Sequence, residues 1–140
     1  TFDLSFFRKL HKEMFGDVWS WAGEFRTTQT SIGVTANMIH QHLYQLQDDL
    51  KYWESEWDYR DTAVRLHHTL VKIHPFPNGN GRWARFATDL WLLKMGYQAL
   101  SWGGNITEMS DARSAYITSL KEADQGNYEP LKSFMFGTEH

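Results

Sequence analysis

Hydrophobic residues recur at every third or fourth position along most of this chain, which is the spacing that lines one face of an α-helix. The first such stretch runs from about Asp3 to Trp21, and its apolar positions are Leu4, Phe7, Leu10, Met14 and Val18. Two further stretches carry Ile39, Leu43, Leu46, Leu50 and Trp53, and then Ala63, Leu66, Leu70 and Ile73. The pattern predicts an amphipathic helix from each, with the second helix entered at Thr35.

The second half of the chain predicts three more helices. The stretch 81–95 is apolar almost all round, which is typical of a buried helix, and Gly96 follows it as a stop. Ser110 is placed to cap a further helix that Gly126 ends. A short last helix begins at Glu129.

The segment between the first two predicted helices has a different composition. Threonines at 27, 28 and 30 precede Ile32-Gly33-Val34. Threonine, isoleucine and valine around a glycine favour strands joined by a turn. We therefore expect a short β-hairpin over residues 24–35 on an otherwise helical protein.

Length, charge and composition narrow the class of protein. The chain has 140 residues, enough for one domain with a substantial core, and its seven Trp make that core rich in rings. A net charge of −3 argues against a nucleic-acid surface. The absence of cysteine excludes disulfides and fits a reducing, cytoplasmic compartment. We expect no signal peptide and no membrane span, and an N-terminus trimmed within a helix start.

His74 is the first candidate for chemistry. It precedes Pro75, so the helix that reaches Ile73 is expected to stop there. An imidazole at a helix end can face a cleft, and its ordinary pKa near ~6.5 makes it a proton acceptor at neutral pH. The alternative is a histidine that only makes a structural hydrogen bond. A zinc pair of His67 with His74 has no further ligand in the sequence pattern.

The loop after His74 is the second candidate. Asn78-Gly79-Asn80-Gly81 predicts a turn that leads directly into a helix, and such a turn exposes backbone N–H groups to an anion. Arg82 and Arg85 follow on one face of the first turns, where the helix dipole disfavours cations unless an anion compensates. The alternatives are an ordinary turn and an internal ion pair of Arg85 with Asp89. The combination favours phosphate chemistry beside a general base.

The run from His74 to Arg85 resembles the signature of the Fic family, His-Pro-Phe-x-Asp/Glu-Gly-Asn-Gly-Arg-x-x-Arg. The resemblance implies an all-α Fic-type helical core with a short β-hairpin flap, and a single Fic domain over residues 1–140. Within the family the chain most resembles the subgroup called mobile mystery protein B, through this run and the stretch 15–19. The flap, expected over residues 24–35, would position the backbone of a target protein beside the histidine by strand addition.

The resemblance also implies roles for the residues of the signature. His74 would deprotonate the attacking hydroxyl, and Phe76 would anchor the loop in the core. Gly79, Asn80 and Gly81 would form the anion hole, and Arg82 and Arg85 would hold the β- and γ-phosphates. The helix that contains Tyr116 resembles one that lines the nucleotide pocket, although a plain core position explains Tyr116 as well.

Asn78 departs from the signature, which usually has Asp or Glu there as a magnesium ligand. Mg²⁺ prefers carboxylates to a neutral amide, so we expect weaker binding of Mg²⁺ or Mn²⁺. Alternatively, Asn78 serves only the turn with Gly79. The family's inhibitory motif, Ser/Thr-x-x-x-Glu-Gly/Asn, has no good copy here. Its inhibitor is therefore absent, lies outside these residues, or is a separate chain.

The resemblance implies a protein adenylyltransferase that transfers AMP from ATP to a Ser, Thr or Tyr hydroxyl of a target protein. A first alternative keeps the enzyme but changes the transferred group to UMP, GMP or phosphocholine. A second alternative is a domain that binds a nucleotide or a partner with little turnover, because Asn78 is neutral.

Overall fold

The computed structural model describes residues 2–29, 32–103 and 111–137. Within these ranges the chain is helical, with no strand assigned. The elements in order are α1 (Leu4–Phe15), a 3-10 turn η1 (Ala36–Met38), α2 (Ile39–Glu56), α3 (Tyr59–Ile73), α4 (Asn80–Lys94), α5 (Asp111–Asp124) and α6 (Glu129–Phe136). The predicted all-α class is therefore confirmed.

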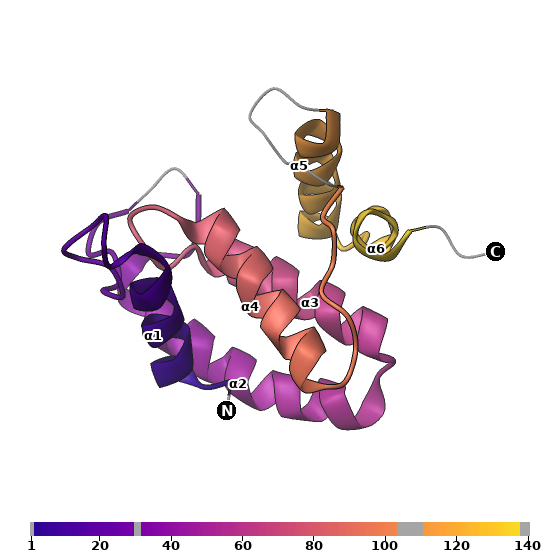
Figure 1. Ribbon diagram of the computed structural model, residues 1–140, viewed down its shortest axis with the longest axis horizontal. Helices are drawn as coiled ribbons and strands as arrows, with labels where there is room; N and C mark the ends of the chain where they lie inside the picture. Colours follow the sequence, from indigo (N-terminus) through magenta and orange to yellow (C-terminus); the bar gives the residue numbers. More distant parts are fainter. Residues whose placement is uncertain (1, 30–31, 104–110, 138–140) are drawn as a thin grey trace.

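Helix α3 is the centre of the fold. It packs against α2, α4 and α6, while α1 covers α4 and α2, and α5 packs on α6 (Figure 1). Its inward positions Leu66 and Leu70 are fully buried, as is Trp83 on α4. Because α3 and α4 lie side by side, the short connection between them is fixed at both ends by buried helices.

The helix starts follow from capping side chains. An oxygen of Asp3 accepts the Phe6 N–H at 2.9 Å to cap α1, and Asp58 accepts the Arg60 N–H at 3.0 Å to cap α3. The helix entered at Thr35 begins with the 3-10 turn before α2. The predicted cap of α5 at Ser110 lies outside the described residues.

The first helix is shorter than its hydrophobic pattern predicted. It ends at Phe15, not at Trp21, and Val18, taken as its last apolar position, is 70% exposed. After Gly16 the chain turns back, and Trp19 packs on Phe15 with ring centroids 4.9 Å apart. Glycine is a weak helix former, so the ring packing that this reversal allows outweighs another helical turn.

The expected β-hairpin over residues 24–35 is not formed in its described part, 24–29 and 32–35. The two arms pair with the end of α3 instead of with each other. The Arg26 N–H donates to the Pro75 carbonyl at 2.9 Å, and the Val34 N–H donates to the Ile73 carbonyl at 3.4 Å. These two backbone donors are therefore not available to a hairpin ladder. Positions 30 and 31 lie outside the described residues.

None of the described helices combines the length and apolar character that a membrane crossing requires.

Candidate active site

His74 occupies the end of α3, as its position before a proline predicted. Its backbone is left-handed, with φ 51° and ψ 62°, and its N–H still donates to the Leu70 carbonyl at 3.2 Å. A non-glycine residue in this region carries strain and is held there by its surroundings. The ring is half-buried, and burial, followed by the charge of Arg26, lowers the pKa of His74. The imidazole is therefore neutral at pH 7 and able to accept a proton.

The ring of His74 differs from those of the buried histidines. His11, His67 and His68 each use ring nitrogens in hydrogen bonds to the protein. Neither ring nitrogen of His74 bonds to another described residue. The structural alternative, a histidine whose ring only makes an internal hydrogen bond, therefore has no partner for His74 among the described residues.

The start of α4 is an uncapped helix N-terminus. Gly79 is the N-cap residue in a left-handed conformation, with φ 79°, and no side chain caps the helix. The first intrahelical bond of the turn runs from the Trp83 N–H to the Gly79 carbonyl at 3.0 Å. The N–H groups of Asn80, Gly81 and Arg82 precede it and have no acceptor among the described residues. They and the helix dipole form a site suited to an anion.

The connection between α3 and α4 packs on buried aromatic rings. Phe76 is fully buried, as expected of its anchoring role, and it stacks on His11 with centroids 3.7 Å apart. His11 accepts the Gly23 N–H at Nδ1, so its Nε2 carries the proton and donates to the Asn78 carbonyl at 3.0 Å. Burial lowers the pKa of His11, which keeps this tautomer neutral.

The Asn80 side chain faces the protein. Its Oδ1 accepts the Phe76 N–H at 2.9 Å, and its Nδ2 donates to the Phe76 carbonyl at 2.7 Å. Asn80 is 4% exposed, so this amide fixes the loop and only the backbone of Asn80 can contribute to an anion hole.

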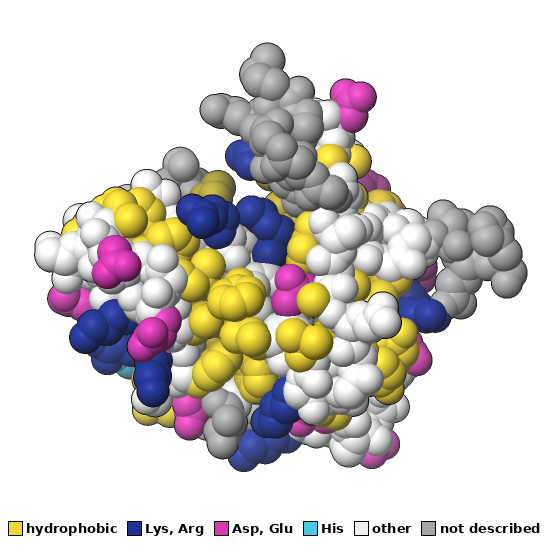
Figure 2. Space-filling model, in the orientation of Figure 1, with side chains coloured by type: hydrophobic (Ala, Val, Ile, Leu, Met, Phe, Trp, Pro, Cys, Tyr) yellow, Lys and Arg dark blue, Asp and Glu magenta, His cyan; other side chains and the backbone are white. Residues whose placement is uncertain are grey.

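Two arginines lie at the same helix start. The guanidinium carbon of Arg82 lies 5.2 Å from the centre of the Phe15 ring, and that of Arg85 lies 5.3 Å from the Tyr116 ring. Nη1 of Arg85 is 3.4 Å from the place that a Cβ on Gly81 would take, so Arg85 bends back towards the helix start. Figure 2 shows basic side chains over this end of α4.

The ion pair of Arg85 with Asp89 is not formed. Asp89 accepts the Leu100 N–H at 3.0 Å and the indole N–H of Trp102 at 3.1 Å instead. Between described residues, the ion pairs within salt-bridge distance are His68–Asp124 and Lys132–Asp61. The positive charges at the start of α4 therefore have no carboxylate within salt-bridge distance in the described part of the chain.

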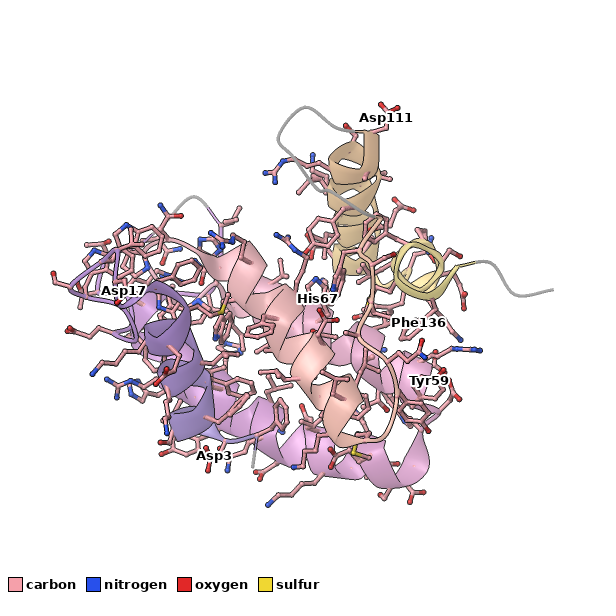
Figure 3. All side chains as sticks on the ribbon, in the orientation of Figure 1. Asp3, Asp17, Tyr59, His67, Asp111 and Phe136 are labelled. Carbon is pink, nitrogen blue, oxygen red and sulfur yellow. The ribbon has the colours of Figure 1, made fainter. Side chains whose placement is uncertain are left out.

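A buried hydrogen-bond chain supports Tyr116, whose ring contacts Arg85. His67, fully buried and labelled in Figure 3, contacts the Thr88 hydroxyl at 3.2 Å and the Tyr116 hydroxyl at 2.7 Å. The Arg85 guanidinium lies over the Tyr116 ring. Burial lowers the pKa of His67 to about 3, so the ring is neutral. With both nitrogens used, His67 is a support for the site and not a metal ligand.

Asn78 offers little to a divalent cation. It is exposed, and its Oδ1 already accepts the Gly79 N–H at 2.8 Å within its own turn. The described residues contain no group of three or more His, Cys, Asp or Glu side chains placed to hold a metal. A neutral amide alone does not make a magnesium site. These residues therefore fit the ion only if a bound nucleotide supplies phosphate oxygens as further ligands.

The structure places the predicted residues as neighbours along one turn. His74 closes α3, Asn78 and Gly79 form the turn, and Gly81, Arg82 and Arg85 open α4. The hollow of about 610 Å³ between α1 and residues 20–24 includes none of them. The sequence reasoning missed Arg26 and His11. For His11 the signal was its position at four-residue spacing between Phe7 and Phe15, on the buried face of α1.

Comparison with known proteins agrees with this geometry. A sequence model of the Fic/DOC family matches residues 1–92, well over half of the chain. Protein adenylyltransferase Fic of Drosophila willistoni is 30% identical over 133 residues, which cover 91% of this chain and 26% of that protein. Protein adenylyltransferase fic-1 of Caenorhabditis briggsae is 26% identical, over 91% of this chain and 25% of that protein. The chain thus spans about a quarter of the length of these curated relatives.

Solved structures share the fold. A Fic domain containing signaling protein from Bacteroides thetaiotaomicron has a TM-score of 0.78 at 20% identity, over 94% of this chain and 56% of that chain. BepC of Bartonella tribocorum, solved with bound AMPPNP, has a TM-score of 0.74 at 21% identity, over 95% of this chain and 72% of that chain. The signature at the α3–α4 turn, the helical fold and the family match agree: the chain belongs to the Fic/DOC family.

Proposed function

We propose that this chain is a protein adenylyltransferase, which transfers AMP from ATP to a Ser, Thr or Tyr hydroxyl of a target protein. The observation that carries the proposal is the α3–α4 turn. It joins a histidine whose ring nitrogens are free of described partners to an uncapped helix start with two arginines. A triphosphate supplies the anion that this helix start lacks, and the histidine supplies the base.

In the proposed reaction, His74 takes the proton of the target hydroxyl as its oxygen attacks the α-phosphorus of ATP. The new bond joins that oxygen to phosphorus, and the bond from the α-phosphorus to the β-phosphate oxygen breaks. The products are the AMP-modified target and pyrophosphate, and the proton is left on His74. General-base help of this kind contributes about 10²–10⁴-fold.

Stabilisation of the leaving pyrophosphate comes from the start of α4. The N–H groups of Asn80, Gly81 and Arg82 point along the helix axis and cost no reorganisation at the moment of transfer. Guanidinium groups match phosphate oxygens in two-point contacts, so Arg82 and Arg85 would hold the β- and γ-phosphates. The neutral state of His74, which burial and Arg26 favour, suits a base at pH 7.

The comparisons support the proposal at the level of the family. The curated relatives are named protein adenylyltransferases. BepC was solved with AMPPNP, and the Fic domain of a Bartonella quintana protein was solved with ADP. The target would dock against residues 24–35, of which Gly33 packs beside His74. A cytoplasmic location is part of the same proposal, as is an inhibitor that lies outside these residues or on a separate chain, if the protein has one.

In this proposal, magnesium or manganese would bind together with the nucleotide and not to the protein alone. Its ligands would be phosphate oxygens and water, and Asn78 would add at most one neutral oxygen. No chemical step in the proposal depends on a metal held by the protein alone.

A second candidate function follows from Asn78. With no carboxylate at this position, the domain would bind ATP at the start of α4 and turn it over slowly or not at all. Transfer of UMP, GMP or phosphocholine is the remaining variant of the enzyme.

One experiment separates these functions. The purified chain is incubated with a cell lysate, Mg²⁺ or Mn²⁺ and nucleotides labelled in the α-phosphate, or with labelled CDP-choline. His74→Ala is run beside His42→Ala, which removes an exposed histidine from α2. Label from ATP that His74→Ala abolishes and His42→Ala keeps supports adenylyl transfer. Label from another donor identifies another group. ATP binding without transfer in either metal supports the binding domain.

A further inference from the structure

Arg26 is buried at the back of the His74 backbone, and no role follows for it from the reaction above. It is 4% exposed, and its guanidinium donates to four backbone carbonyls. Nε donates to His74 at 2.6 Å, and Nη1 donates to Thr28 at 3.1 Å. Nη2 donates to Ile73 at 3.1 Å and to Val34.

Two of these carbonyls belong to the end of α3. The last carbonyls of a helix have no partner within it, and a cation there is favoured by the helix dipole. Arg26 therefore caps the helix at the residue that carries the base. His74 adopts φ 51°, a strained conformation that persists only where the surroundings fix it, and the bond from Nε is its direct restraint.

The other two carbonyls belong to the two arms of the segment 24–35. Thr28 lies on the first arm and Val34 on the second, so one side chain ties both arms to His74. The packing is close. A Cβ on Gly33 would lie 2.7 Å from Nη2 of Arg26 and 2.8 Å from the Cβ of His74.

We propose that Arg26 is a positioning residue for the transfer reaction: it fixes the described arms of the target-docking segment, 24–29 and 32–35, and the backbone of His74 in one arrangement. This inference rests on the proposed function, because it assigns Arg26 to the base and the docking segment of that reaction. A target bound along residues 24–35 is then held at a constant distance from the imidazole. The charge of Arg26 also contributes to the lowered pKa of His74, after burial.

The test compares Arg26→Gln and Arg26→Lys with Arg8→Gln. Arg8 is exposed, donates to the Gly23 carbonyl at 3.0 Å and lies over the Phe25 ring at 5.3 Å, so it contacts the same segment away from His74. A misplacement of about 1 Å at a reacting group can cost ~100-fold, and we expect a loss of that order in kcat/KM for the target in Arg26→Gln. Arg26→Lys keeps the charge but not the fork, so it should recover part of the loss. Arg8→Gln should stay within about threefold of the unchanged chain.

The affinity for ATP separates positioning from general loss of structure. The start of α4 does not contact Arg26, so the Kd for ATP in Arg26→Gln should match that of the unchanged chain. Wild-type transfer in Arg26→Gln would overturn the inference. A joint loss of melting temperature, ATP affinity and transfer would also overturn it, because Arg26 would then only stabilise the fold.

Gly33→Ala gives a second route should Arg26→Gln fold poorly. Gly33 and Gly96 both have positive φ, 103° and 91°, so alanine strains the backbone at both positions. Only at Gly33 does the new Cβ press on Arg26 and His74, since nothing lies within 4 Å of a Cβ on Gly96. Gly33→Ala should therefore lose transfer with ATP affinity intact, and Gly96→Ala should keep both. Equal transfer by the two variants would overturn the inference.

Failure of the proposed function is recognised separately. If His74→Ala still transfers label, the assignment of the base is wrong whatever Arg26 does. The effect of Arg26 on the backbone of His74 is then measured by amide hydrogen exchange. The His74 N–H, bonded to Leu70, should exchange about tenfold faster in Arg26→Gln and at the unchanged rate in Arg8→Gln. An unchanged rate in Arg26→Gln would overturn the positioning role.

Discussion

Replacement of Arg85 by alanine distinguishes a nucleotide-binding arginine from a structural one. In the folded chain the Arg85 guanidinium carbon lies 5.3 Å from the centre of the Tyr116 ring, without an ion pair to Asp89. Asp89 keeps its bonds from Leu100 and Trp102 when Arg85 is removed. The substitution therefore leaves no carboxylate stranded in the protein.

The contacts of Arg85 determine how much its removal should change the stability of the fold and the affinity for ATP. A half-exposed cation–π contact contributes about 0.5–1 kcal/mol. The free energy of unfolding of Arg85→Ala should therefore fall by about 0.5–1 kcal/mol, or roughly 2–4 °C in melting temperature. Charged hydrogen bonds to phosphate are each worth about 1.5–3 kcal/mol, so the Kd for ATP should rise about 10- to 100-fold.

Calorimetric titration with ATP and thermal melting measure the two effects on the same samples. Arg65→Ala is the matched control, because Arg65 lies over the Tyr128 ring at 4.0 Å on a side of the fold away from the start of α4. It should lose a similar amount of stability and keep its affinity for ATP. The reasoning is refuted if Arg85→Ala melts at a lower temperature but binds ATP as tightly as Arg65→Ala does.

Three further predictions address the support of the site, the metal and pH. Tyr116→Phe removes the hydroxyl that bonds to the buried His67, so the chain should lose about 1–3 kcal/mol of stability by thermal melting, whereas Tyr44→Phe, at an exposed tyrosine, should change it little. Asn78→Asp should tighten Mg²⁺ binding and speed automodification several-fold in a label-transfer assay, and an unchanged or slower rate would show that position 78 lies outside the metal shell. Because burial lowers the pKa of His67 to about 3, the unfolded chain binds its proton first as pH falls from about 6.5 towards 3. This histidine then costs about 1.4 kcal/mol of stability per pH unit over that window, and denaturant unfolding should show a shallower loss in His67→Gln.

The sequence predicted the parts of the site that depend on local chemistry. Pro75 ends the helix at His74, and glycines make the turn that opens α4, because these effects act between chain neighbours. Fully apolar positions such as Leu66 and Leu70 were equally readable from their spacing.

The sequence could not show what depends on contacts between distant segments. Thr27 and Val34 favour strands locally, but the arms that carry them bind the end of α3 and Arg26, so no hairpin forms in the described residues. The side chain of Asn80 holds Phe76, a contact that the turn pattern did not predict, and only its backbone N–H is left for the predicted anion hole.

The same limit applies to buried polar side chains. Helical spacing put Tyr116 on an inward face but could not place its hydroxyl against His67, since the two residues come from α5 and α3. Likewise, Arg85 and Asp89 are one turn apart and suggest an ion pair, which the competing donors Leu100 and Trp102 prevent.

The central claim is that a triphosphate binds at the start of α4 beside His74. Backbone amide NMR of the chain during titration with ATP tests it most directly, because the N–H groups of Asn80, Gly81 and Arg82 would donate to phosphate oxygens. The account predicts that these amide resonances shift most and saturate together, while those of Gly96 and Gly126 stay in place. Saturable ATP binding that leaves the resonances of residues 80–82 unmoved would contradict it.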